Sequence, residues 1–118
     1  MNRKIVFIRD DDVYKIDKSF INIFEFCLKK EVPIIYGVIP NKITPDLIKI
    51  LNKTKKKYPR LIDMVQHGWQ HKNYTPDLTN KFEFGATRNY QQQKKDIEKG
   101  LNRMVEIFNK NFTPAFIP

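Results

Sequence analysis

The sequence has a single cysteine, only four glycines, and no long apolar run. Since a disulfide needs two thiols, Cys27 cannot form one within the chain, and its apolar helical context predicts a small core residue. A membrane-spanning helix needs about 20 apolar residues, so we expect no membrane partner. The apolar run behind Arg3 and Lys4 stops at Arg9, short of the ~7–15 residues of a signal-peptide core, and we therefore expect a cytoplasmic protein.

Acidic side chains are the minority among the charged residues, with 13 Asp and Glu against 22 Lys and Arg, which gives a net charge of +9. Such an excess can serve nucleic-acid binding. The basic residues are spread over every predicted helix, and the densest block, residues 53–57, lies at a predicted helix end, where cations offset the helix dipole. This distribution favours a solvated basic surface over a nucleic-acid partner, although the charge can still steer an anionic substrate.

Apolar runs alternate with amphipathic stretches along the chain. Continuous apolar runs predict buried strands at residues 5–8, 33–39, 61–65 and 112–117. Apolar side chains at helical spacing predict helices at residues 17–30, from residue 45 to the basic block, and at 87–109. The second helix has Thr44 as its capping residue and Asp46 at its positive end. Residues 67–85 form a polar segment longer than most structural loops, which favours a functional role.

Continuous apolar strands that alternate with helices predict an α/β fold, in which a parallel sheet is covered by helices in the order βαβαβ-loop-αβ. At 118 residues the chain is a single domain. It stays apolar up to Pro118, whereas most domains end in a polar or anchored segment. We therefore expect residues 1–118 to be the N-terminal portion of a longer domain, with an open sheet edge that allows self-association.

Both histidines fall within five residues, His67 to His71, and three consecutive aspartates, Asp10 to Asp12, follow the first apolar run. The carboxyl ends of parallel strands share one edge of the sheet, where α/β proteins collect functional residues. Two imidazoles and one carboxylate can bind a divalent cation, with Zn²⁺ the best fit, and a catalytic site keeps one position open. If the second segment forms one helical turn, both rings lie on one side of it. The sequence thus predicts a metal site.

An Asp-Asp pair closing the first strand and His-x-x-x-His closing the third resemble motifs of the polysaccharide deacetylase family, the NodB-type carbohydrate esterases. The run from Arg9 to Val13 is most similar to the Arg-x-Asp-Asp-Val motif of a divergent intracellular branch. The resemblance implies a partial (β/α) barrel and a hydrolase that removes acetyl groups from N-acetylated sugars. The resemblance also implies that Asp11 is the catalytic base and that the metal ligands are Asp12, His67 and His71. A register shifted by one residue makes Asp10 the base and Asp11 the ligand, and strand alternation alone leaves both open.

The chain departs from the family at three places. The family usually has Ser or Thr after the first histidine, where this chain has Gly68. Its third motif has an arginine that the segment from Thr113 to Phe116 lacks. Since no histidine follows His71, the family's catalytic acid has no counterpart, and the resemblance covers only the first half of a catalytic domain.

Three further side chains are candidate substrate-binding residues, namely Arg9, Asp10 and Trp69. Arg9 can keep Asp11 ionised or simply reach solvent, and Trp69 can stack on a pyranose or pack within the protein. Two other functions stay open on this sequence. One is hydrolysis of another amide or ester on the same scaffold, and the other is a basic polyanion-binding module in which the Asp and His residues are incidental.

Overall fold

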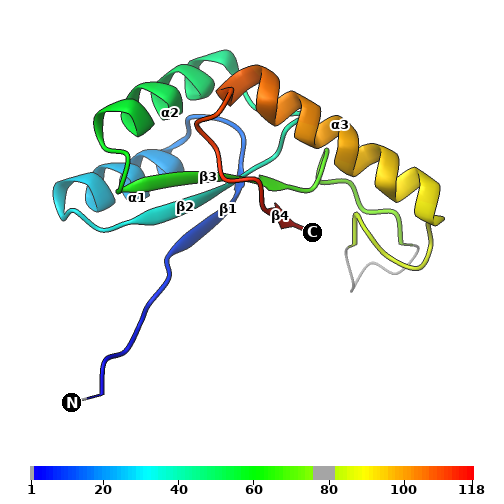
Figure 1. The fold of residues 1–118 in the computed structure, drawn as a ribbon, viewed down its shortest axis with the longest axis horizontal. Coiled ribbons are helices and arrows are strands. Elements are labelled where there is room, and N and C mark those ends of the chain that lie inside the picture. The colour runs from blue at the N-terminus through cyan, green and yellow to red at the C-terminus, as the bar shows by residue number, and fades with distance from the viewer. Residues whose placement is uncertain (1, 76–81) are drawn as a thin grey trace.

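The structure, a computed structural model, describes residues 2–75 and 82–118. Within these ranges the elements are β1 (Arg9–Val13), α1 (Lys18–Lys29), β2 (Ile34–Val38), α2 (Pro45–Lys57), β3 (Ile62–His67), α3 (Tyr90–Phe108) and β4 (Phe116–Ile117). The strands form one parallel sheet in the order β1-β2-β3-β4, which curls into a half-barrel (Figure 1). The predicted α/β fold, a partial barrel of parallel strands with helices, is confirmed.

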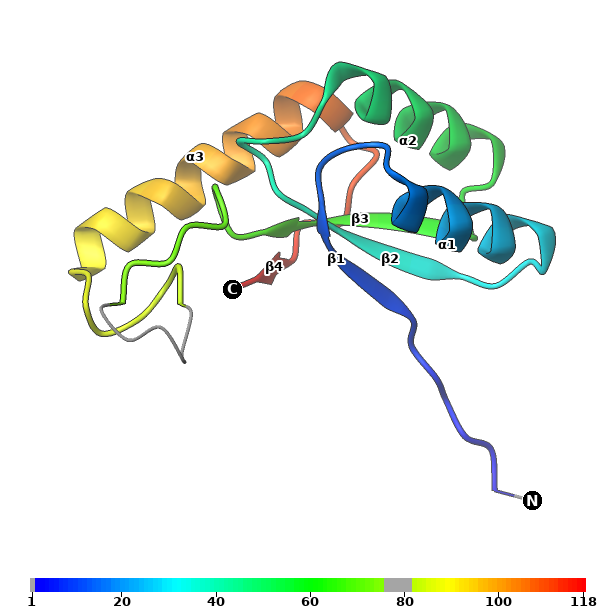
Figure 2. The ribbon, with the colours of Figure 1, turned by 180° about the vertical axis from the view of Figure 1, so that it is seen from behind.

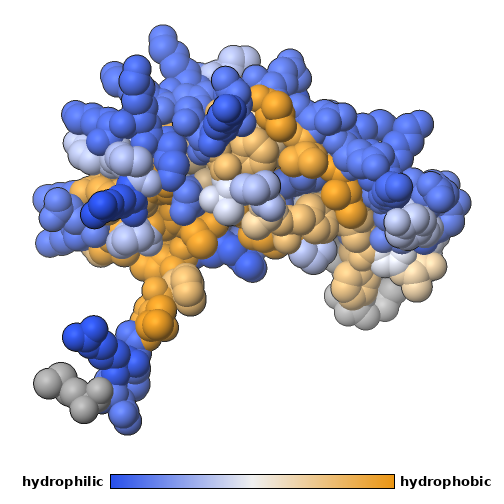
Figure 3. All heavy atoms as spheres, viewed as in Figure 1, coloured by the Kyte–Doolittle hydropathy of each residue, from blue (hydrophilic) through white to orange (hydrophobic). Residues whose placement is uncertain are grey.

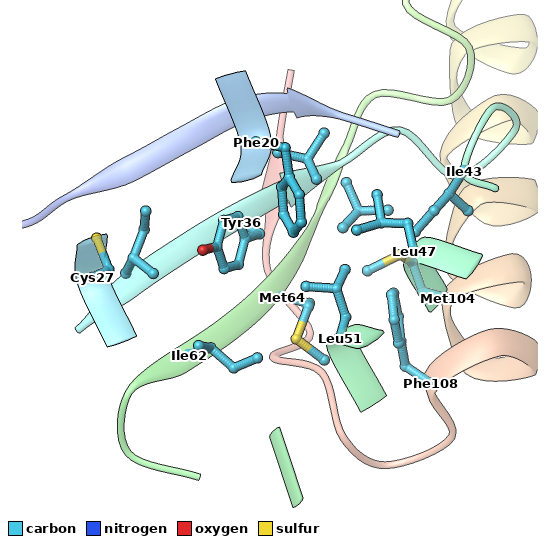
Figure 4. Close-up of a cluster of buried hydrophobic side chains, with 13 residues drawn as sticks. Phe20, Cys27, Tyr36, Ile43, Leu47, Leu51, Ile62, Met64, Met104 and Phe108 are labelled. Atoms are coloured by element: carbon cyan, nitrogen blue, oxygen red, sulfur yellow. The ribbon is translucent and has the colours of Figure 1, made fainter. Parts of the chain in front are cut away.

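The three helices lie on one side of the sheet, and the opposite face has no helix on it in the described residues (Figures 1 and 2). Since successive strand residues point to opposite faces, every second residue of β2 and β3 packs under the helices. These residues include Tyr36 and Met64, both 0% exposed, which meet Phe20 of α1, Leu51 of α2 and Phe108 of α3 (Figure 4). The intervening residues therefore line the uncovered face.

Local capping explains where the helices begin. The Asp17 carboxylate accepts a hydrogen bond from Phe20 N at 2.8 Å, which fixes the start of α1 as predicted. Asn89 and Gln92 form a capping box, so α3 begins at Tyr90 and not at residue 87. Thr44 is the N-cap residue of α2, but its hydroxyl makes no capping bond.

The predicted strand over residues 5–8 is wrong. In the described chain, β1 begins at Arg9, opposite Ile35, and Phe7 is 81% exposed. Residues before Ile8 would have to pair with residues 31–33, where the chain is turning out of α1 and where Pro33 has no N–H to donate. The aspartates thus lie inside the first strand instead of following it.

The other strands differ from the prediction mainly at their ends. β3 runs to His67, so the first histidine closes the strand itself. The predicted strand 112–117 shortens to Phe116–Ile117, because a tight bond from Ala115 N to Thr113 O, 2.7 Å long, bends the chain around Pro114. Of the predicted polar segment 67–85, residues 76–81 lie outside the described residues.

Candidate metal centre

Asp12, His67 and His71 meet at the carboxyl edge of the sheet. Asp12 Oδ1 lies 2.8 Å from His67 Nε2 and 3.0 Å from His71 Nε2. One ligand atom from each of the three residues lies within 4.8 Å of the other two. Two segments separated by more than 50 residues therefore direct three potential ligands to one point.

A bulge in β1 directs Asp12 to the histidines. Asp10 is paired with Tyr36 and Val13 with Val38, so β1 advances three residues while β2 advances two. Asp12 has a φ of 61°, in the left-handed region. A bulge takes a side chain out of the regular alternation of its strand and is common beside functional sites.

His71 also has a left-handed backbone, with a φ of 54°. The segment after His67 contains a bend at residues 69–70 and no helical turn, and Gly68, with a φ of 59°, immediately precedes this bend. The other described non-glycine residues with positive φ, Glu31 and Asn109, follow helix ends, where this conformation is common. The two left-handed residues without a helix end to explain them are thus Asp12 and His71, and backbone strain of this kind clusters at functional sites.

The donor set fits a zinc ion. Two imidazole nitrogens and one carboxylate oxygen are ligand types that Zn²⁺ takes, and here the carboxylate oxygen lies at hydrogen-bond distance, 2.8 and 3.0 Å, from the two nitrogens. The His67 side chain is 11% exposed, whereas those of His71 and Asp12 are 50% and 54% exposed, so one side of the cluster faces solvent. His67 Nδ1 is buried and has no hydrogen-bond partner in the described chain, although such nitrogens usually have an outer acceptor.

Asp11 lies next to this cluster, on the uncovered face of the sheet. A Cβ built on Gly37 would lie 2.9 Å from Asp11 Oδ1 and 3.3 Å from His67 Cβ, so the two side chains flank the bare backbone of Gly37. Arg9 Nε is 2.9 Å from Asp11 Oδ1, but this buried oxygen receives no well-directed hydrogen bond from the described residues. Arg9 thus provides a charge contact to this oxygen.

Asp10 is not brought to the cluster. It lines a hollow with Cys27 and other α1 residues and is paired across the sheet with Tyr36, on the helix side. Burial, and then the negative charges of neighbouring aspartates, Asp11 first, raise the pKa of Asp10. Of the two registers that the sequence left open, the geometry therefore favours the one with Asp12 beside the histidines.

Trp69 is half-buried, and the Lys99 ammonium of α3 lies 5.9 Å from its ring centroid. The structure thus brings this indole to α3. Two residues that the sequence analysis missed contribute to the centre, Gly37 and Glu83. The Glu83 carboxylate accepts hydrogen bonds from the backbone between Gly68 and His71. Neither residue type marks a site by itself, because both act through contacts between distant parts of the chain.

Comparisons with known protein families, curated proteins and solved structures found no match for this chain. Among the described residues, none of the helices combines the length and the hydrophobicity needed to cross a bilayer.

Proposed function

We propose that this chain is a metal-dependent hydrolase, similar in chemistry to the polysaccharide deacetylases, that removes acetyl groups from N-acetylated sugars in the cytoplasm. Asp12, His67 and His71 would hold the cation, with Zn²⁺ the best fit. The observation that carries the proposal is that one carboxylate oxygen lies within 3.0 Å of two imidazole nitrogens. The left-handed backbone at two of these three residues supports it.

A bound cation of this kind polarises a carbonyl group and lowers the pKa of a water to about 7. The residues of the chain supply the proton transfer and the orientation. Asp11 lies beside His67 on the uncovered face of the sheet, and its carboxylate is proposed to accept the proton of the attacking water. The Arg9 guanidinium, 2.9 Å away, holds this carboxylate in place.

The direct test is zinc binding to the purified protein, measured by isothermal titration. We expect the wild type to bind one equivalent, and His71→Ala and Asp12→Asn to lose more than the ~10–100-fold in affinity that removal of an outer partner costs. Asp63→Asn is the matched control, because Asp63 lies near the other end of β3 and pairs with Lys55. The proposal would be wrong if the wild type bound no zinc, or if the ligand variants bound zinc with the affinity of the wild type.

Substrate trials separate the sugar deacetylase from the alternative, a hydrolase of another amide or ester on the same scaffold. Acetate release from N-acetylated sugars, abolished by chelator and by Asp11→Asn, is the expected result. Hydrolysis of non-sugar amides alone would support the alternative.

One lysine of the densest basic block is not available to a polyanion. Lys55, within this block, is only 18% exposed in its side chain and forms an ion pair with Asp63 at 2.8 Å. Its ammonium also donates to the carbonyl oxygens of Pro59 and Ile62. This lysine is thus occupied in holding α2 on the sheet.

A further inference from the structure

The Glu83 carboxylate accepts hydrogen bonds from three consecutive backbone N–H groups. Oε1 lies 3.0 Å from Trp69 N and 2.7 Å from Gln70 N, and Oε2 lies 3.0 Å from His71 N. Successive N–H groups that point to one place form a concave site for an anion, and bonds to a charged acceptor are stronger than neutral ones. One side chain thus binds the whole bend that ends at His71.

Gly68 makes room for this carboxylate. A Cβ at position 68 would lie 2.1 Å from Glu83 Oε2, and its φ of 59° already disfavours other residues. The Glu83 carboxylate therefore occupies the space that a side chain at position 68 would fill. From there it accepts the hydrogen bonds of the backbone at residues 69–71.

Glu83 is itself held on the protein through Arg88. The Arg88 guanidinium donates to the backbone carbonyl of Glu83 at 3.3 Å and to Asp96 of α3 at 2.7 Å. The side chains of Arg88 and Asp96 are 10% and 11% exposed. A continuous set of contacts thus connects α3, through Glu83, with the bend.

We propose that Glu83 is a positioning residue for the metal centre, and the inference rests on the proposed function of that centre. Its carboxylate fixes residues 68–71 in the strained conformation that directs His71 to Asp12. Glu83 is not among the described residues whose ligand atoms come together at the centre, and its two oxygens instead accept from backbone N–H groups.

Glu83→Gln tests this role with little change in size. The amide carbonyl can replace only one carboxylate oxygen, and the amide NH₂ then faces a backbone N–H donor. Hydrogen exchange should become faster at the amides of residues 69–71, and zinc affinity by titration should fall about 10–100-fold. Glu83→Asp, which keeps both acceptor oxygens, should recover part of the loss. The matched control is Glu25→Gln, the same change of charge on the exposed surface of α1, and it should leave both measurements unchanged.

The two readouts separate the failure of this inference from that of the proposed function. Unchanged exchange at residues 69–71, or faster exchange with unchanged zinc affinity, would overturn the role of Glu83. If the wild type binds no zinc, the proposed function fails, and the exchange measurement alone decides whether Glu83 holds the bend. Should Glu83→Gln not fold, Gly68→Ala provides the second variant, because its Cβ displaces the carboxylate and should produce the same two effects.

Discussion

At the scale of single residues, the missing side chain of Gly37 determines where Asp11 and His67 can lie. A Cβ at this position would be 2.9 Å from Asp11 Oδ1 and 3.3 Å from both Asp11 Cα and His67 Cβ. Asp11 Cα and His67 Cβ belong to β1 and β3, so neither atom can move away without a shift of its strand. The close approach of β1 and β3 side chains over β2 therefore requires glycine.

We predict that Gly37→Ala lowers the rate of hydrolysis more than it lowers zinc affinity, because the added methyl group displaces the proposed base first. Overpacking of this kind should also cost about 1–3 kcal/mol in the free energy of unfolding. Steady-state kinetics, zinc titration and urea denaturation measure the three effects. Gly85→Ala is the control, since its Cβ would meet Phe82 Cβ at an ordinary 3.4 Å. Unchanged kinetics in Gly37→Ala would show that Asp11 is not constrained here.

Residue types alone predicted part of this site. The histidines and aspartates predicted a metal site because few other side chains bind metals. The structure brings Asp12, His67 and His71 together. The choice between the aspartates depended on the bulge in β1, which moves Asp12 out of regular alternation. A bulge results from the pairing of two strands, so the sequence of one strand does not show it.

At the scale of elements, the start of α2 relies on a carboxylate. Asp46 accepts a hydrogen bond from Leu47 N at 2.9 Å and lies at the positive end of the helix dipole. The neighbouring Thr44 hydroxyl holds the pKa of Asp46 below its usual value of 3.8 against the opposing effect of desolvation, and the Leu47 N–H lowers it further. The folded protein thus binds this proton less readily than the unfolded chain does.

A depressed pKa stabilises the fold above the unfolded value of 3.8, and this stabilisation is lost as the pH falls through the lower, folded value. We predict that Asp46→Asn melts at a lower temperature than the wild type at about pH 7, and that the difference shrinks at pH values below the usual carboxyl pKa. Thermal denaturation followed by circular dichroism over a pH series measures it. If the difference in melting temperature did not depend on pH, the effect would come from the shape of the side chain at position 46 and not from its charge, which would contradict the prediction.

The elements were predictable where one face of each is buried. The helices and the strands β2 and β3 have a regular apolar pattern because the core imposes it, and their positions were predicted closely. Residues 5–8 are as apolar as β2, yet they remain outside the sheet because their would-be partner is a turn with Pro33. The first strand is instead the charged run from Arg9, whose pairing depends on β2 and not on its own hydropathy.

At the scale of the whole molecule, the open edge of β1 is preceded by a segment of exposed apolar side chains. In the described residues β1 has β2 as its only strand neighbour. Ile5, Val6 and Phe7, which precede it, are 81%, 80% and 81% exposed, and apolar surface gathers where this segment joins the body of the molecule (Figure 3). Unpaired strand edges of this kind are templates for pairing with another chain.

We predict that the purified protein self-associates through this edge and the apolar segment before it, and that the double variant Val6→Lys, Phe7→Lys does so much less, because it places two charges in that segment beside the open edge. Sedimentation velocity over a concentration series measures the change. Val105→Lys is the control, since it places the same charge on an apolar residue of α3 that is 51% exposed. A wild type that stays monomeric, or an equal effect of the control, would contradict the prediction.

The salt dependence of this association has a definite sign. Two chains of net charge +9 repel each other, and the screening length shortens from about 8 Å at 0.15 M salt to about 3 Å at 1 M. Association through apolar surface should therefore strengthen as salt is added. Binding to DNA or RNA would weaken over the same range, because it depends on the release of counterions. One salt series, run with and without a nucleic acid, thus decides whether the basic surface opposes self-association or binds a polyanion. If self-association weakened as salt was added, the apolar segment at this edge would not be its cause.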